Sequence, residues 1–494
     1  MKSGAEFILA RMQSSHSRTR IALWIAAGIL LRLALIAFAR PAYWGDTAGY
    51  LELGHNLFHH GVYGLADNGG FAPSLYRLPG YPLFLAAMEL LFAKIWPQSW
   101  MNAVFFVQAA ADLAGGLLLA ALARQQFSAR TAEIVLALAM LCPFTAAYAS
   151  IALSESLSIF AVALGVYAAG RASAAAQAGA RDRSALLLAG CAAALAMLLR
   201  PDGVLLFAAM AAGLFWYTAR CGIAGRGGWR GLKDGAASAA LFCLAALAPL
   251  APWTLRNWRA FHVFQPLSSV YQNDPGERPS LGFYRWALTW SDEYASTIDS
   301  LCCIGEREID VGLLPQRAFD SPQQRELTAR LLAEYNRELS VSPELDDRFA
   351  ALAADRIRAH PLRFYLGLPA LRVADMVLRP RTEAFYLDAY WWRFGRHPGQ
   401  TAIAVLLGLI NLAYMALAAW AFLRGRVPWP WMLGGYILAR CLMLTTMYYA
   451  EQRYTLEFFP IVFIAAALAL APAAEDRKPQ REQGRGTHNV GRTP

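Results

Sequence analysis

The stretch IALWIAAGILLRLALIAFARPAYWGDTAGYLELG, from Ile21 to Gly54, decides the fold class. Its first part, Ile21 to Ala39, is apolar apart from one arginine, and about 20 such residues span the hydrocarbon core of a bilayer. A single carboxylate, Asp46, follows a few residues after the apolar run ends. The stretch therefore predicts a membrane-spanning helix that delivers an acidic side chain to the membrane surface.

Composition extends this prediction to the whole chain of 494 residues. Hydrophobic residues make up 57% of it, above the roughly 45–50% of soluble domains, and they form runs about as long as a membrane span. The formal net charge of +10 would suggest nucleic acid in a soluble protein, but in membrane proteins Lys and Arg collect in cytoplasmic loops. We predict an all-α, multi-pass membrane protein that contacts membrane lipids and no nucleic acid.

The distribution of Lys and Arg orients the chain. One apolar run, 81–96, is short, carries Glu89 and Lys94, and is bracketed by prolines. If it lies flat on the membrane, all six basic clusters face the cytoplasm, whereas if it spans, the later basic loops face outward. We take the flat arrangement, with about ten spans and both termini in the cytoplasm. The predicted spans are 21–39, 102–123, 131–150, 153–170, 184–200, 201–219, 235–251, 401–423, 428–449 and 455–472.

This topology divides the chain into parts with different environments. Within the outer region, the segment HPLRFYLGLPALRVADMVL (360–378) is amphipathic and predicts membrane-surface helix. The Gln-, Arg- and Gly-rich tail predicts disorder. The parts are a cytoplasmic N-terminus (1–20), a transmembrane core (21–251) with a first outer loop (40–101), an outer region (252–400), C-terminal spans (401–472) and a basic cytoplasmic tail (473–494).

Four arginines are predicted on the outer side, although Lys and Arg usually collect on the cytoplasmic side, so their position requires an explanation. One such arginine at a helix end is more often an anchor that snorkels to the interface. Four at about the same depth, each beside aromatic residues or proline, favour an anion site, because the planar guanidinium is a preferred partner of phosphate. They are Arg77 in SLYRLPGYP, Arg200 in LLRPDG, Arg256 in PWTLRN and Arg453 in EQRYTLEFFP.

Two acids on the same side are candidates for catalysis. Asp46 either caps a helix that starts at Thr47 or acts as a base, and the two roles are compatible. Glu155 lies in SIALSESLSIF, in a turn so short that its carboxylate stays near the bilayer, and acids at that depth are functional candidates by default. A carboxylate near arginines in a partly dry cleft suits general-base work.

Aromatic and polar residues beside these charges are candidates for substrate contact. Tyrosine and tryptophan rings offer apolar faces to a sugar or a prenyl chain, although an interfacial aromatic belt explains them equally well. Tyr43 and Trp44 belong to the same aromatic group. The substrate-binding candidates are Tyr50, Tyr76, Tyr81, Asn257, Glu451 and Tyr454.

His55 and His59 are spaced i, i+4 and share one face of a helix. The spacing is compatible with a pair of metal ligands, but no third ligand has a diagnostic spacing in the sequence. A polar surface or a contact with the acceptor is therefore the preferred interpretation, and we predict no metal ligands.

In their order along the chain, these motifs resemble the GT-C glycosyltransferases. More narrowly, they look like bacterial relatives of the protein O-mannosyltransferases and of the lipid A aminoarabinose transferase, in glycosyltransferase families 39 and 83. The resemblance covers about residues 20–472. It rests on an acid after the first span, then YRLPGYPLFLAAMELLF, LLRPDG, PWTLRN and EQRYTLEFFP. It implies transfer of a sugar from a polyprenyl-phosphate donor to a cell-envelope acceptor at the bacterial inner membrane, with the active site facing the periplasm.

The resemblance also implies roles for individual residues. The acid of the first outer loop is the catalytic one, which is Asp46, and a second acid after the third span is Glu155. The family often has a Lys near the first proline of its loop, where this chain has Arg77, so the contact to the donor phosphate departs from the pattern. Metal dependence varies in the family, so no cofactor is assigned and a divalent metal stays open.

Chemistry read from the residues agrees with this implication. Inverting transfer needs a base on the acceptor hydroxyl and charge stabilisation for the departing phosphate. Asp46 is the expected base, and Arg256 and Arg453 are expected to hold the phosphate, with Arg200 and Arg77 behind them. No Gly-rich nucleotide loop or Asp-x-Asp pair is present, which disfavours a nucleotide-sugar donor.

Other functions stay open at this point. A flippase or transporter of lipid-linked saccharides would need a charged path through the bundle and often repeated halves, and the sequence shows neither. A function as a non-catalytic membrane scaffold would not explain the four outer arginines. A ligase of surface polysaccharide would be an enzyme of the same kind with a lipid-linked oligosaccharide as donor.

Overall fold

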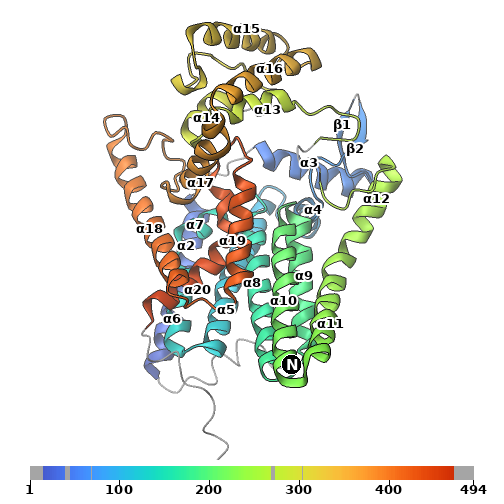
Figure 1. Cartoon of the computed structure of the whole chain (residues 1–494), viewed down its shortest axis with the longest axis vertical. Helices are drawn as coiled ribbons and strands as arrows, with labels where there is room; N and C mark the ends of the chain where they lie inside the picture. Colours follow the sequence, from blue (N-terminus) through green and yellow to red (C-terminus); the bar gives the residue numbers. More distant parts are fainter. Residues whose placement is uncertain (1–14, 39–44, 68, 269–272, 303, 472–494) are drawn as a thin grey trace, which may run out of the picture.

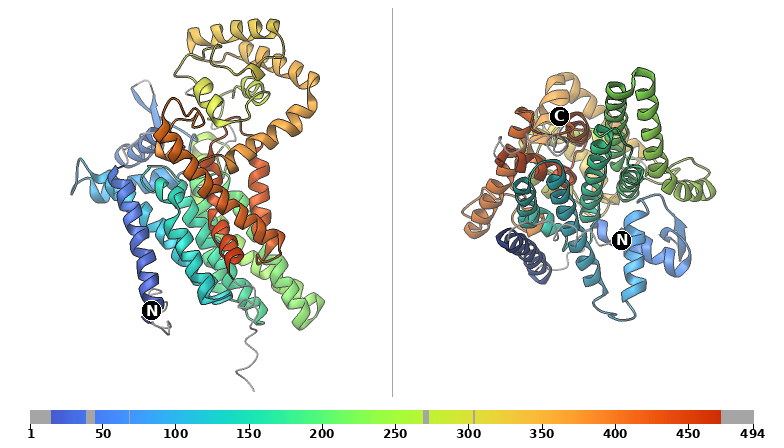
Figure 2. Two further views of the ribbon diagram at one scale, coloured as in Figure 1. Left: turned by 90° about the vertical axis from the view of Figure 1, so that its left-hand side faces the viewer. Right: turned by 90° about the horizontal axis from the view of Figure 1, so that it is seen from below.

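The computed structural model describes residues 15–38, 45–67, 69–268, 273–302 and 304–471. Long helices form a bundle, and shorter helices are stacked on one end of it, as Figures 1 and 2 show. In the described residues one sheet occurs, the antiparallel pair β1–β2, which pairs Gly64 with Pro73 and Asp67 with Gly70. The prediction of an all-α fold is thus confirmed apart from this short hairpin.

The elements follow one another in this order: α2 (Ser15–Phe38), α3 (Gly45–His60), β1 (Gly64–Asp67), β2 (Gly70–Pro73), α4 (Gly80–Phe92), α5 (Trp100–Gln126), α6 (Ala129–Leu141), α7 (Pro143–Tyr148), α8 (Glu155–Gln177), α9 (Arg183–Leu199), α10 (Gly203–Arg226), α11 (Gly228–Leu247), η1 (Ala248–Leu250), α12 (Ala251–Phe261), α13 (Leu281–Leu288), α14 (Tyr294–Leu301), η2 (Gln316–Ala318), α15 (Pro322–Glu338), α16 (Pro343–Ala359), the π-helical turn η3 (Arg363–Gly367), α17 (Leu368–Leu378), η4 (Glu383–Phe385), α18 (Pro398–Leu423), α19 (Pro430–Leu444), η5 (Gln452–Phe458) and α20 (Phe459–Leu470).

Seven helical segments among the described residues are long and apolar enough to cross a membrane, which makes the chain a multi-pass membrane protein. They are Arg18–Phe38, Trp100–Gln126, Glu155–Gln177, Gly203–Gly225, Gly228–Phe261, Pro398–Leu423 and Gln452–Leu470. The count of ten spans is therefore not confirmed.

The other three predicted spans are shorter helices because proline or turn residues interrupt them. The run 131–150 is divided between α6 and α7 at Pro143, which sits at the start of α7. The run 184–200 forms the 17-residue α9, and 428–449 forms the 15-residue α19. A helix of 15–17 residues is about 23–26 Å long at 1.5 Å per residue, below the roughly 30 Å of a hydrocarbon core.

Helix continues across residue 252, where the outer region is predicted to begin. It runs without a gap from Gly228 through η1 to Phe261. Proline is tolerated in the first turn of a helix, and Pro249 and Pro252 are the second residues of η1 and α12. The short run after Pro79 forms α4, which has 13 residues, and the five-part division of the chain stays a prediction.

The stacked helices α13, α15 and α16 have an apolar core of their own. Phe283, Trp286 and Trp290 pack against Tyr335 and Phe349, all of them fully buried. A core of this kind makes the group a small separate layer beyond the end of the bundle, visible at the top of Figure 1.

Arg372 ties this layer to the bundle. Its guanidinium is buried and donates to the carbonyls of Leu288 and Ser291 in the layer and of Thr445 after α19. Arg372 lies on α17, within the segment 360–378 that the sequence predicts at the membrane surface. The segment is divided into η3 and α17, and Pro369 is the second residue of α17.

One pair of opposite charges lies inside the bundle, between α2 and α5. Arg32 of α2 and Asp112 of α5 form an ion pair at 2.6 Å, and the Arg32 guanidinium also donates to the carbonyls of Gly28, Ala139 and Met140. Both side chains are nearly completely buried. The pair fixes α2, the most peripheral span, against α5 and α6.

Candidate active site

Asp46 lies between two arginines at the end of the bundle that faces the stacked helices. It sits in the first turn of α3, where the helix dipole favours a negative charge. Arg77 Nη2 is 2.5 Å from Asp46 Oδ1, and Arg453 Nη2 is 2.8 Å from Asp46 Oδ2. Arg77 comes from the loop before α4, and Arg453 from η5, which is 407 residues away from Asp46 in the chain. The structure therefore brings together three of the predicted site residues.

These contacts determine the charge of Asp46. Burial alone would raise its pKa, but Arg453 and then Arg77 outweigh this effect, so the pKa lies below the usual value for Asp. Asp46 is ionised at neutral pH, and both of its oxygens accept from a guanidinium. It becomes available as a base when another anion takes one of the two arginines.

Glu155, the second predicted catalytic acid, is connected to Asp46 through Arg453. Arg453 Nη1 is 3.6 Å from Glu155 Oε1, and Arg200 Nη1 is 3.2 Å from the same oxygen. Glu155 is the first residue of α8 and its side chain is almost fully buried. Its second oxygen, Oε2, is buried without a hydrogen-bond partner, which is costly for a carboxylate and marks an acceptor that a substrate hydroxyl or a water can fill.

A second group of charges lies behind Arg200 and was not predicted as part of the site. Arg200 Nε is 3.2 Å from both Asp202 Oδ1 and Glu457 Oε1. Arg440 of α19 is buried and pairs with the same two acids, at 2.9 Å and 2.7 Å. The signal was present in the sequence, because a charge within or beside a span is costly. The paired residues are far apart in the chain, however, in the turn before α10, on α19 and in η5.

Acids and arginines in this region almost balance. The carboxylates outnumber the guanidiniums by one, so the cluster is not an open patch of positive charge. A phosphate that binds here competes with a carboxylate for an arginine. The acids are Asp46, Glu155, Asp202, Glu451 and Glu457, and the arginines are Arg77, Arg200, Arg440 and Arg453.

The predicted tyrosines pack around the arginines. The Arg77 guanidinium carbon is 4.5 Å from the ring centre of Tyr76 and 5.4 Å from that of Tyr50. Tyr454 lies beneath Arg453 and Arg200 in the same manner, at 5.2 Å and 5.5 Å. These rings support the guanidiniums through cation–π contacts.

Tyr81 and Glu451 differ in how they meet the cluster. Tyr81 is fully buried and donates to Gln108 Oε1 at 2.7 Å, so its position is that of a core residue. Glu451 forms an ion pair with Arg453 Nε. Tyr43 and Trp44 lie outside the described residues.

Arg256 and Asn257 do not join the cluster. The Arg256 guanidinium donates to the carbonyl oxygens of Tyr63 and Ser74, at 3.0 Å for Ser74, and so fixes the β1–β2 hairpin to α12. Asn257 is buried and donates to the carbonyl of Gln265 at 2.7 Å. The assignment of Arg256 to the donor phosphate stays a prediction, and these contacts give it a structural role.

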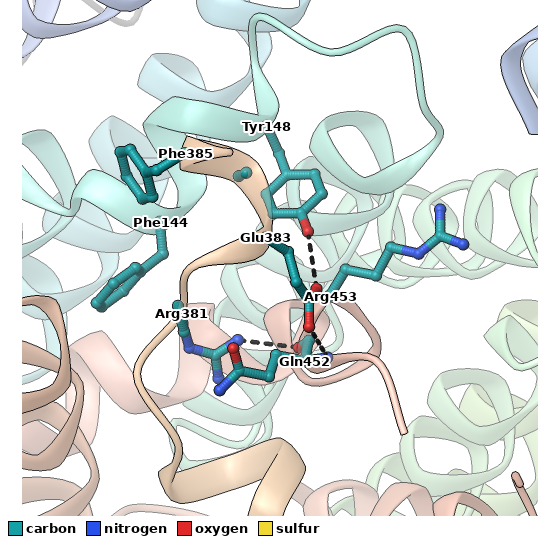
Figure 3. A pocket seen from close by; sticks show the side chains of 8 residues that line it. Phe144, Tyr148, Arg381, Glu383, Phe385, Gln452 and Arg453 are labelled. Carbon is teal, nitrogen blue, oxygen red and sulfur yellow. Dashed lines mark hydrogen bonds between the residues drawn. The ribbon is translucent and has the colours of Figure 1, made fainter. Parts of the chain in front are cut away.

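A small cavity adjoins Arg453 on the side away from Asp46. Figure 3 shows Tyr148, Glu383 and Gln452 linked by hydrogen bonds, while the Arg453 guanidinium extends away from them. The volume of about 10 Å³ is that of one water molecule. The lining residues are Phe144, Tyr148, Arg381, Glu383, Ala384, Phe385, Gln452 and Arg453.

A larger groove of about 450 Å³ lies next to this cavity, between α17, α18 and the segment after α17. Arg379 lines the groove and connects it to the cavity, because its Nη2 pairs at 2.9 Å with Glu383, which lines the cavity. Its Nε and Nη1 are buried without a hydrogen-bond partner, and Asp375 Oδ2 is 3.9 Å from Nε. The groove is lined by Asp375, Leu378, Arg379, Pro380, Trp391, Val405, Gly408, Leu409 and Leu412.

The donor set at Asp46 does not fit a metal ion. Arg453 occupies the position between Asp46 and Glu155, the two acids that would have to share the ion. A cation there would compete with a permanent positive charge.

Comparison with known proteins supports the fold. A family model described as Dolichyl-phosphate-mannose-protein mannosyltransferase matches residues 79–253. No curated protein matches the chain. Since the family model covers about a third of the chain, it supports the resemblance noted from the motifs over that part.

Solved structures give the same picture. The archaeal oligosaccharyltransferase AglB from Archaeoglobus fulgidus, in complex with an inhibitory peptide and a dolichol-phosphate, is 13% identical over 92% of this chain, with a TM-score of 0.51. An oligosaccharyltransferase of the same organism in complex with Zn and sulfate is 14% identical over 91%, with a TM-score of 0.50. The chain spans about half the length of these structures, 50% and 48%. ArnT from Cupriavidus metallidurans in the apo state matches 92% of this chain and 78% of its own at 14% identity, with a TM-score of 0.40.

At these identities the likeness concerns the fold. The multi-pass helical bundle with a polar layer on one end is GT-C-like, as the sequence motifs predicted.

Proposed function

We propose that the chain is an integral membrane glycosyltransferase that transfers a sugar from a polyprenyl-phosphate donor to a cell-envelope acceptor. The observation that carries this proposal is Asp46, an ionised acid held by Arg77 and Arg453 at the end of the bundle. In this arrangement Asp46 can take the proton of the acceptor hydroxyl, and the two arginines can bind the donor phosphate. The GT-C-like fold and the family-model match over 79–253 support the same reaction class.

The reaction assigned to this site is a single displacement with inversion. The donor phosphate competes with Asp46 for Arg453 and frees Oδ2. The acceptor oxygen then attacks the anomeric carbon while its proton passes to Asp46, and the bond from that carbon to the phosphate oxygen breaks. Arg453, with Arg77 and Arg200 beside it, holds the negative charge that develops on the departing polyprenyl phosphate.

The groove beside α18 is assigned to the chain of the lipid carrier. Its wall is mostly apolar, with Leu409 and Leu378 exposed on the outside of the bundle. Its lining includes Arg379, whose Nε and Nη1 are buried without a hydrogen-bond partner. Arg379 contacts Glu383 and Gln452, and both of these line the small cavity together with Arg453. A lipid lying in the groove would therefore point its head toward the catalytic cluster.

Transport of a lipid-linked saccharide is less well supported. Arg32 and Asp112, which are buried within the bundle, neutralise each other, and the Arg32 guanidinium also donates to two backbone carbonyls. A path for a charged head group would need free polar groups at that depth.

Binding of a lipid phosphate tests the proposal without knowledge of the acceptor. We expect undecaprenyl phosphate to raise the Tm of the purified protein in detergent, since a ligand that binds only the folded state stabilises it. Undecaprenol, the same chain without the phosphate, is the control for detergent-like effects. Arg453→Ala should lose most of the difference between the two lipids, whereas Arg424→Ala, on the exposed end of α18, should keep it. Equal responses to phosphate and alcohol would overturn the assignment.

A further inference from the structure

Three side chains with metal-ligating atoms meet on the outside of α3 and α4, apart from the active site. His55 Nδ1 is 3.0 Å from Glu89 Oε1, and His59 Nε2 is 3.4 Å from the same oxygen. The ligand atoms of the three residues all lie within 4.8 Å of one another. The sequence offered the histidine pair without a third ligand, and the fold supplies it from a different helix. Among the described residues this is the one group of three His, Cys, Asp or Glu residues so placed.

The distances between the three ligand atoms match those around a tetrahedrally coordinated metal ion. With bonds of about 2.0–2.2 Å to nitrogen and oxygen, neighbouring ligand atoms of Zn²⁺ lie about 3.3 Å apart. Two of the three separations already have this length, and the third closes by rotation of exposed rings. About half of each histidine side chain is exposed, 49% and 45%, which leaves room for water at the fourth position.

The two helices hold the ligands in place. Gly54, next to His55, packs so closely against α4 that an added Cβ would lie 2.5 Å from the carbonyl oxygen of Pro82. This contact holds α3 close to α4 at a position next to His55 and about two turns before Glu89. The two histidine rings are aligned one turn apart, with centres 4.2 Å from each other.

We propose that His55, His59 and Glu89 bind a divalent transition-metal ion, with Zn²⁺ as the best match. Two imidazoles and one carboxylate are a common ligand set for this ion. The ion would join α3, whose first turn carries Asp46, to α4, which begins three residues after Arg77. It would therefore stabilise the part of the fold that positions both residues, without contact to the substrate.

Zinc titration of the untagged, EDTA-treated protein tests the site. Calorimetry with Zn²⁺ should show one ion per chain for wild type. His55→Gln and His59→Gln should each weaken binding on the order of tenfold or more, and the double variant should lose it. His60→Gln is the matched control, because His60 is on the same helix but stacks on Phe71. Mg²⁺ should have no effect at the same concentration, since it prefers oxygen ligands.

A second measurement separates metal binding from folding defects. In EDTA, His55→Gln, His59→Gln and His60→Gln should each have the Tm of wild type, because these residues are at the surface. Zn²⁺ should raise the Tm of wild type and His60→Gln only. Unchanged zinc binding in the double variant, or no zinc-dependent rise in Tm for wild type, would refute the site. The binding of undecaprenyl phosphate is an independent readout, so failure here leaves the proposed function untouched.

Discussion

Arg440 offers a direct test of the buried ion network behind the candidate active site. Its side chain is 1% exposed, and its Nη2 lies 2.9 Å from Asp202 and 2.7 Å from Glu457. Its Nε also donates to the carbonyl of Tyr454 at 2.7 Å. Arg440→Met keeps much of the volume and removes the charge, so Asp202 and Glu457 are left with Arg200 as their shared partner.

The expected loss follows from these contacts. Removing one partner of a buried ion pair costs about 3–5 kcal/mol. Since Arg200 stays 3.2 Å from both acids, we expect the lower end, about 3 kcal/mol. At about 2 °C per kcal/mol for a large domain, Tm should fall by about 6 °C in detergent.

Two further variants show whether the reasoning is correct. Arg440→Met with Glu457→Gln removes the stranded carboxylate and should recover at least about half of the loss, because the uncompensated charge is the main cost. Arg424→Met, at the exposed end of α18, should change stability by no more than about 0.5 kcal/mol. If Arg440→Met and Arg424→Met have the same Tm, the network does not stabilise the fold. If the double variant is less stable than the single one, the stranded charge is not the cause.

Three other predictions follow from the packing and charge of the same region. Gly54→Ala should lower Tm by several degrees, because its Cβ meets the Pro82 carbonyl at 2.5 Å, while Gly435→Ala, which has nothing within 4 Å, should not lower it; equal Tm values would show that α3 and α4 can separate freely. Burial raises the pKa of Asp375 to about 6 from its usual 3.8, so the folded state binds this proton more tightly than the unfolded state does. The contribution of Asp375 to the free energy of unfolding is therefore complete below about pH 3.8 and is lost as the pH rises through 6. A Tm profile should therefore fall more steeply between pH 4.5 and 7 for wild type than for Asp375→Asn, and parallel profiles would contradict this. Arg453→Ala should raise the donor KM more than the acceptor KM, whereas Arg256→Ala, which loosens the β1–β2 hairpin, should affect both alike; a donor-specific effect of Arg256→Ala would return it to the phosphate site.

The membrane fold was predictable from the sequence because repeated apolar runs of span length are typical of membrane helices. The ends of the individual helices were harder to predict, because they depend on how each proline is accommodated. At Pro143 the helix breaks, whereas at Pro249 and Pro252 a 3₁₀ turn carries the helix onward to Phe261. Sequence patterns do not distinguish these two outcomes.

The core of the candidate site was predictable in part. Asp46 and Arg77 belong to one loop, and Arg453 was placed with them on the argument that outer arginines share one depth. The same argument included Arg256, whose guanidinium binds the carbonyls of Tyr63 and Ser74. Depth is readable from the sequence, but the direction of a side chain within the membrane plane is set by helix packing.

Contacts between helices account for the residues that sequence patterns missed. Glu457 stood in a quoted motif, and Arg440 is a charge within a predicted span, yet their pairing joins η5 to α19. Glu89 was considered only as a charge that disfavours a span, whereas α4 places it against His55 and His59. Such partners become visible once the register of one helix against another is known.

The proposed function depends on Asp46 as the base of a glycosyl transfer from a lipid phosphate. It is tested most directly by the transfer of radiolabelled sugar from a panel of polyprenyl-phosphate donors, in membranes that contain wild type, Asp46→Asn or Asp46→Glu. We expect Asp46→Asn to lose activity by about 10²-fold or more while its Tm response to undecaprenyl phosphate stays, and Asp46→Glu to retain some activity. Transfer by Asp46→Asn at the rate of wild type would show that Asp46 is not the base.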